Sequence, residues 1–122
     1  MSATSKPWLV AALVWTAAIL AVNSISITDA PIPTFSGADK LTHTGMYAIA
    51  AFAWRSAFRS RNEIVSVGIV LGIALLGAFD EWRQLAVPGR SAEVRDWLAD
   101  VVGALLGVII SRRLFARRGA AA

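Results

Sequence analysis

Four apolar stretches alternate with short polar segments along the chain. They cover residues 8–22, 41–54, 64–79 and 97–110, and most charged side chains fall at or between their ends. With their flanking residues they predict helices over residues of about 8–24, 41–58, 64–82 and 96–114. Each apolar run is shorter than a full membrane span, so we expect either that the polar helix ends enter the outer part of the bilayer or that the bilayer thins around them. The pattern predicts an all-α fold, a four-helix antiparallel transmembrane bundle with short loops, forming a single domain over residues 1–122.

The first apolar run has a second interpretation, as a secretory signal peptide with Lys6 at its charged start. No clear cleavage site of small residues follows it, and the rest of the chain continues with further apolar helices. We therefore interpret residues 8–24 as a membrane helix.

Composition supports an integral membrane protein. Hydrophobic residues make up 57% of the chain, and its mean hydropathy is +0.60. The chain has no cysteine, which excludes disulfides, thiolate metal sites and cysteine nucleophiles. The net charge of +4 does not indicate a nucleic-acid partner, because the basic residues flank apolar runs and do not form a polar face.

The charges divide unequally between the two ends of the predicted bundle. The end with both termini carries one acid, Glu63, and eight basic residues: Lys6, Arg55, Arg59, Arg61, Arg112, Arg113, Arg117 and Arg118. The other end carries four basic residues and seven acids. Because basic loops stay in the cytoplasm, we expect a multi-pass protein of the cytoplasmic (inner) membrane with both termini inside. Residues 112–122 would be a basic cytoplasmic tail.

Polar residues gather at the predicted outer end in two clusters. Residues four apart share one helix face, which applies to Asp39, His43 and Tyr47 and also to Asp96 and Asp100. Asp100 is the deepest acid, so we expect it to face the bundle interior or water, with Arg90 or Lys40 as its partner. The full set is Asp39, Lys40, His43, Tyr47, Asp80, Glu81, Gln84, Arg90, Asp96 and Asp100.

These residue types suit a site for an anionic lipid headgroup. Histidine beside carboxylates can transfer protons, so we take His43, Asp39, Asp80 and Glu81 as candidate catalytic residues. Basic and polar groups can bind phosphate, which makes candidate ligand-binding residues of Lys40, Tyr47, Gln84, Arg90, Asp96 and Asp100.

Three other interpretations stay open. The polar groups can instead be closed ion pairs and caps that hold a purely structural or interaction protein together. A small oligomeric channel or proton relay through Asp100 is a further alternative, although the second to fourth predicted helices lack a chain of polar residues that reaches the cytoplasmic end. A divalent cation suits one histidine with several carboxylates, but these residues match no strong ligand spacing, so we expect no metal and no cofactor.

Two glycine motifs stand on the third and fourth apolar runs. They are GIVLG at residues 68–72 and GALLG at residues 103–107, both of the form GxxxG. Small residues at this spacing let helix backbones approach closely. We interpret both motifs as packing surfaces within the bundle.

The polar segments resemble those of VanZ-like membrane proteins. DKLTHTGMYAIAAFA is similar to the family's DK-x-x-H-x-x-x-Y segment. FDEWRQLAVPGRSAEVRDWLADVVGALLG is similar to its DE-x-x-Q…PGR…D-x-x-x-(D/N)-x-x-G-x-x-x-G segment. The match covers residues 38–108. Beyond the candidates above, it includes Pro88, Gly89 and Gly103.

Two positions depart from the pattern. Arg83 stands where many relatives carry histidine, so a mechanism that needs a second histidine is not supported. Asp100 stands where some relatives carry asparagine. The named member of the family is associated with resistance to the glycopeptide teicoplanin. The resemblance implies a similar site of action, at the outer face of the cytoplasmic membrane where lipid-linked cell-wall precursors are exposed, and it does not imply resistance itself. We expect a membrane lipid or lipid-linked cell-envelope precursor as the partner, while an enzymatic activity and the oligomeric state stay open.

Overall fold

Four helices make up the fold in a computed structural model that describes residues 4–23, 38–59, 62–86 and 94–121. They are α1 (Lys6–Asn23), α2 (Ala38–Ala57), α3 (Glu63–Gln84) and α4 (Val94–Ala121). The described residues form no strand beyond one isolated β-bridge between Thr4 and Phe58. The all-α prediction with four helices is thus confirmed. Helix α4 continues past its predicted end into the basic tail, since Ala, Leu and Arg are strong helix formers.

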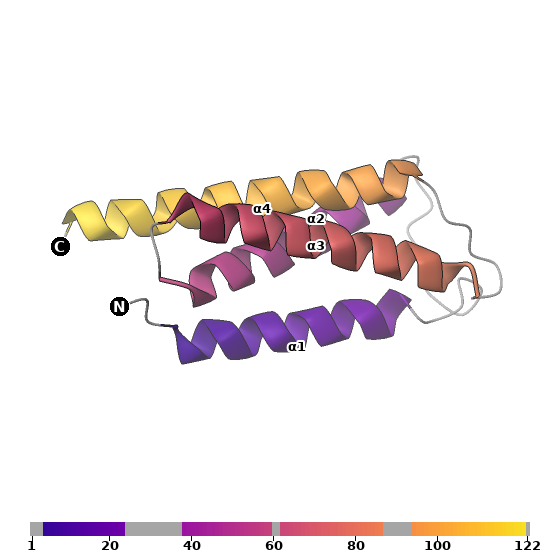
Figure 1. Cartoon of the computed structure of the whole chain (residues 1–122), viewed down its shortest axis with the longest axis horizontal. Helices are drawn as coiled ribbons and strands as arrows, with labels where there is room; N and C mark the ends of the chain where they lie inside the picture. Colours follow the sequence, from indigo (N-terminus) through magenta and orange to yellow (C-terminus); the bar gives the residue numbers. More distant parts are fainter. Residues whose placement is uncertain (1–3, 24–37, 60–61, 87–93, 122) are drawn as a thin grey trace.

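Successive helices run in opposite directions, so α1 begins and α4 ends at the same end of the bundle (Figure 1). Helix α2 packs most extensively against α4 and also contacts α1 and α3, while α3 packs against α4 as well. Helix α2 is therefore central, and the polar residues near its start meet those near the end of α3 and the start of α4.

Close contact between α2 and α4 depends on the GALLG motif. A β-carbon at Gly103 would lie 2.3 Å from the carbonyl oxygen of Thr44, and one at Gly107 would lie 2.1 Å from that of Ala48. Only glycine allows the two backbones to approach so closely. The packing interpretation of GALLG is therefore correct, and this contact sets the spacing of α2 and α4.

The matching motif on α3 behaves differently. Gly68 and Gly72 are exposed, and a β-carbon at either position would meet no atom within 4 Å among the described residues outside its own helix. The packing interpretation of GIVLG is wrong within this bundle. The motif lies on a face of α3 that α2 and α4 do not cover.

Tryptophan side chains connect the helices by hydrogen bonds to polar atoms. The Trp15 indole donates to the carbonyl of Met46 at 2.8 Å, and Trp54 donates to the Thr16 hydroxyl at 2.9 Å. Trp97 donates to the carbonyl of Ala74 at 2.9 Å, which joins α4 to α3. Because the N–H group of each of these half-buried indoles has a partner on a neighbouring helix, these rings help to fix the rotation and depth of the helices.

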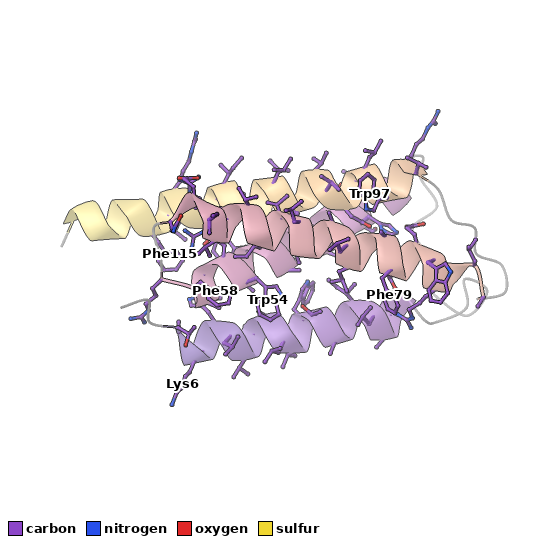
Figure 2. The ribbon with its side chains drawn as sticks, viewed as in Figure 1. Lys6, Trp54, Phe58, Phe79, Trp97 and Phe115 are labelled. Atoms are coloured by element: carbon purple, nitrogen blue, oxygen red, sulfur yellow. The ribbon has the colours of Figure 1, made fainter. Side chains whose placement is uncertain are left out.

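At the end where α1 begins, polar side chains also pair across helices. The buried Arg55 guanidinium donates to the Ser66 hydroxyl and to the carbonyl of Phe58, each at 2.8 Å. The buried hydroxyls of Ser56 and Ser111 lie 2.8 Å apart, and exposed Arg112 pairs with Glu63. Figure 2 places Lys6 and Phe115 near this end and Phe79 and Trp97 toward the opposite end.

One of the described helices is long and apolar enough to cross a membrane, over Glu63–Arg83 of α3. Lys6–Val22 of α1 is apolar but shorter. Helices α2 and α4 carry several charged residues, including Arg55, Asp100 and Arg112, which lowers their hydropathy. A four-span topology therefore does not follow from helix composition alone.

Candidate functional site

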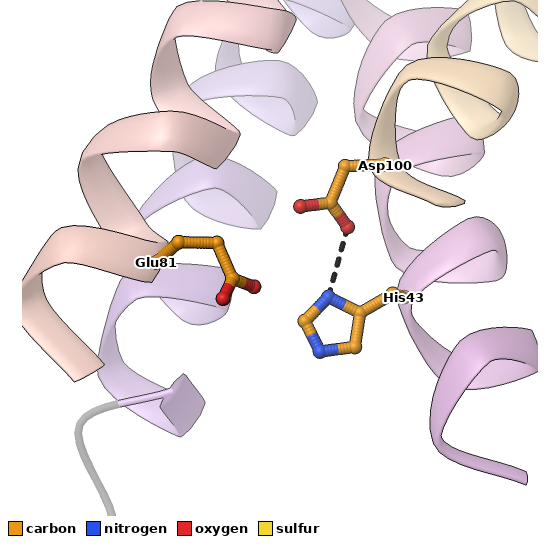
Figure 3. Close-up of side chains that lie close together, drawn as sticks. All are labelled: His43, Glu81 and Asp100. Atoms are coloured by element: carbon orange, nitrogen blue, oxygen red, sulfur yellow. Dashed lines mark hydrogen bonds and ion pairs between the residues drawn. The ribbon is translucent and has the colours of Figure 1, made fainter. Parts of the chain in front are cut away.

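The candidate site is built around a buried histidine–aspartate pair. The Nδ1 atom of His43, on α2, lies 2.8 Å from Oδ1 of Asp100, on α4 (Figure 3). His43 is 4% exposed and Asp100 is 1% exposed. When Asp100 is ionised, Nδ1 carries the proton and donates it, so Nε2 can accept a second proton.

Tyr47 and Asp80 extend the pair toward α3. The α-helix places His43 and Tyr47 on one face, four residues apart, and their rings stack with centroids 6.3 Å apart at 4°. The buried Tyr47 hydroxyl donates to Oδ2 of Asp80 at 3.3 Å. Arg83 donates to the other oxygen, Oδ1, at 3.2 Å and lies over the Phe79 ring, 5.8 Å from its centroid. Asp80 is therefore held by groups from two helices.

Glu81 enters the same region from α3. Adjacent residues on an α-helix point about 100° apart, so Asp80 and Glu81 face different neighbours. Glu81 is 7% exposed, and its carboxylate lies with the side chains of His43 and Asp100 (Figure 3). One ligand-type atom from each of these three residues lies within 4.8 Å of the others.

Gly77 and Thr44 help to position Asp100 beside His43. Gly77 of α3 is buried against Asp100, and a β-carbon there would lie 2.9 Å from Oδ2 of the aspartate. Thr44, next to His43, donates its hydroxyl to the carbonyl of Ala99 at 3.3 Å, beside Asp100. Gly77 was not predicted as part of the site, because a glycine within an apolar run does not indicate which side chain of another helix will pack against it.

The structure brings together five of the sequence-predicted residues, namely His43, Tyr47, Asp80, Glu81 and Asp100. The side chains of Asp39, Lys40, Gln84 and Asp96 lie outside the described residues, as do Pro88, Gly89 and Arg90 entirely. Asp100 was expected to pair with Lys40 or Arg90; the structure shows His43 as a partner. Arg83 is the residue whose contact was missed, although its i, i+3 spacing from Asp80 is a usual signal for such a pair.

This cluster has two chemical capacities. An imidazole hydrogen-bonded to a carboxylate is oriented to accept and return a proton. Carboxylates and an imidazole from three helices can also hold a cation. The hydrogen bonds of His43 and Tyr47 also join α2 to α4 and α3, so these side chains stabilise the bundle as well as forming the site.

Comparison with known proteins identifies the family. The model of the VanZ/LLP1 family matches residues 8–116, nearly the whole chain. Neither the curated proteins nor the solved structures give a match. Members of the family are membrane proteins, in agreement with the candidate span in α3. The chain belongs to the VanZ/LLP1 family.

Proposed function

We propose that this protein spans the cytoplasmic membrane several times and binds an anionic lipid or lipid-linked cell-envelope precursor at the outer face. The observation that carries the proposal is the meeting of His43, Asp80, Glu81 and Asp100 from three helices at one end of the bundle. Buried ionisable groups within a membrane protein are costly and mark functional sites more often than not.

Charge and surface composition support the membrane arrangement. Lys6, Arg55 and Arg112 lie at the end opposite the candidate site, as the positive-inside rule requires if that end is cytoplasmic. The outer faces of the helices are apolar and suit contact with lipid. Large exposed apolar side chains include Leu13 and Val14 of α1, Leu71 and Leu75 of α3, and Leu105 and Ile109 of α4.

Absence of cysteine allows a direct test of this topology. Single cysteines can be introduced by Arg59→Cys, after α2, and by Leu85→Cys, after α3, both at exposed positions. In intact cells, a membrane-impermeant thiol reagent should label the Leu85→Cys variant and leave the Arg59→Cys variant unlabelled until the cells are lysed. The opposite labelling pattern would place the termini outside.

Phosphate binding is assigned in this proposal to Arg90 and Lys40, with His43 transferring a proton. Both basic residues enter from the sequence pattern alone. The test is titration of the purified protein with a short-chain phosphatidylglycerol and, separately, with an isoprenyl diphosphate. Arg90→Ala should weaken binding by at least about tenfold, the loss expected for a charge-assisted contact. Arg113→Ala, an exposed arginine at the other end, is the matched control. Equal affinity in wild type and Arg90→Ala would remove the phosphate role.

A role in teicoplanin resistance belongs to the same proposal. Expression of wild type should raise the teicoplanin concentration that a susceptible host tolerates, and His43→Ala should cancel the increase without lowering the amount of protein in the membrane. If expression of wild type left the tolerated teicoplanin concentration unchanged, this chain would have no role in resistance.

A purely structural role is the second candidate. It is favoured by the hydrogen bonds from His43 to Asp100 and from Tyr47 to Asp80, which lock α2 against both neighbours. In that case His43→Ala should lower the unfolding temperature, and neither wild type nor the variant should bind a lipid headgroup.

A further inference from the structure

Three side chains of the types that bind metal ions in proteins converge in the interior of the bundle. They are His43 of α2, Glu81 of α3 and Asp100 of α4, with exposed fractions of 4%, 7% and 1%. We propose that they form a binding site for a divalent transition-metal cation, with Zn²⁺ or Mn²⁺ as the ion of matching chemistry.

The geometry is close to what one ion requires. One ligand-type atom from each residue lies within 4.8 Å of the other two. In the metal-free protein the Nδ1 proton of His43 lies in the 2.8 Å hydrogen bond to Asp100 Oδ1, so an ion held by both atoms would replace that proton. Metal–ligand distances of about 2.0–2.2 Å place the ligand atoms of one ion about 3–3.6 Å from one another. Side-chain movements on the order of 1 Å therefore suffice, and Figure 3 shows the Glu81 carboxylate on the side that faces the pair.

Local charge favours a cation at this position. Carboxylates of Asp80, Glu81 and Asp100 are all buried within the same region, with Arg83 bonded to Asp80. A divalent ion bound here would interact favourably with several carboxylates at once, and such attraction is strong in a low-dielectric interior. Tyr47 keeps Asp80 turned toward itself, which leaves Glu81 and Asp100 nearest to the imidazole.

Donor types narrow the choice of ion. Imidazole nitrogen suits Zn²⁺ and other transition metals, whereas an all-oxygen set suits Mg²⁺ or Ca²⁺. A mixed set of one nitrogen and two carboxylates fits Zn²⁺ or Mn²⁺ and leaves coordination positions for a substrate oxygen. At the proposed headgroup site, such an ion would bind a phosphate oxygen and polarise it. That use of the ion depends on the proposed function, while cation binding itself does not.

Spacing in the sequence did not indicate this site, because each ligand comes from a different helix. The ligands are separated by 38 and 19 positions (81 − 43 and 100 − 81), so no short motif exists to be found. Only the packing of α2, α3 and α4 brings them together.

Binding can be measured on the full chain in detergent with the metal alone. After treatment with chelator, titration with Zn²⁺ by calorimetry should give one site per chain. The isosteric variants Glu81→Gln and Asp100→Asn should each bind at least about tenfold more weakly, the loss typical when a metal site loses part of its support. Glu63→Gln removes an exposed carboxylate at the other end and is the matched control. Equal affinity in all four proteins, or no binding by folded wild type, would overturn the proposal.

A second measurement needs no variant. The chain has one histidine, so selective ¹⁵N labelling gives signals from His43 alone. Zn²⁺ should shift one ring nitrogen strongly, and Mn²⁺ should broaden both by paramagnetic relaxation. Unchanged histidine signals at a saturating metal concentration would exclude this site, whatever the calorimetry shows. Headgroup titrations repeated with chelator present then distinguish the two proposals. Headgroup binding that persists without metal would support the proposed function and show that the ion is not required for it.

Discussion

His43 and Asp100 are 57 positions apart in the chain, yet their side chains meet at 2.8 Å in the interior of the bundle. The pair joins the start of α2 to the start of α4 and brings an imidazole beside two acids. The candidate site is built around that contact, and ¹⁵N spectroscopy of His43 can examine it directly.

The first prediction concerns the proton on this pair. With Asp100 ionised, the hydrogen bond requires the proton of neutral His43 to reside on Nδ1. In metal-free protein, ¹⁵N spectra of the labelled histidine should therefore show the Nδ1–H form. Asp100→Leu, which retains no acceptor, should shift the population toward the Nε2–H form that neutral histidine ordinarily prefers. A wild-type spectrum already dominated by Nε2–H would contradict the assignment.

The second prediction compares the two GxxxG motifs. Gly103→Ala should destabilise the bundle by about 1–3 kcal/mol, because its methyl group would collide with the carbonyl of Thr44. Gly72→Ala, in open space on α3, should instead stabilise it by about 0.5–1 kcal/mol through helix propensity. Unfolding in detergent, followed by circular dichroism, measures both. Similar destabilisation by Gly72→Ala would show that this face is covered in the folded protein.

Gly77 provides the third prediction. A methyl group at this position would press on the Asp100 carboxylate, so Gly77→Ala should displace that side chain. We expect a loss of Zn²⁺ affinity of at least about tenfold, comparable to disturbing a supporting contact of a metal site. Gly68→Ala on the same helix is the control and should keep wild-type affinity. Wild-type affinity in Gly77→Ala would show that Asp100 can move aside without cost.

The fourth prediction tests the serine pair at the opposite end. Ser56→Ala or Ser111→Ala alone should cost about 1 kcal/mol, because each leaves the other buried hydroxyl without this bond. The double variant should be less destabilised than the sum of the two, since both partners are then apolar. The comparison requires four unfolding measurements, on wild type, both single variants and the double variant. Strict additivity would mean that the two hydroxyls do not interact.

The sequence predicted where the helices lie and which residues share one face of a helix, but it did not predict the contacts between helices. The four-residue spacing of His43 and Tyr47 correctly placed both on one face. The depth of Asp100 within an apolar run predicted that it faces the bundle interior or water, and the structure shows it in the interior. The bond between Asp100 and His43 could not be predicted from the sequence, because the rotation of α2 relative to α4 depends on packing over their whole length. The two GxxxG motifs differ in the same way: Gly103 packs closely against α2, whereas a β-carbon at Gly72 would meet no atom within 4 Å in the described part of the chain outside its own helix.

Gly103 has a consequence for how relatives of this protein should be compared. It lies one turn after Asp100, and it contacts the residue that follows His43. The backbone contact at this glycine therefore acts as a fixed spacer that sets the distance between the imidazole and the carboxylate. A chain that kept His43 and Asp100 but carried a larger residue at position 103 would hold the same reactive groups too far apart to work together.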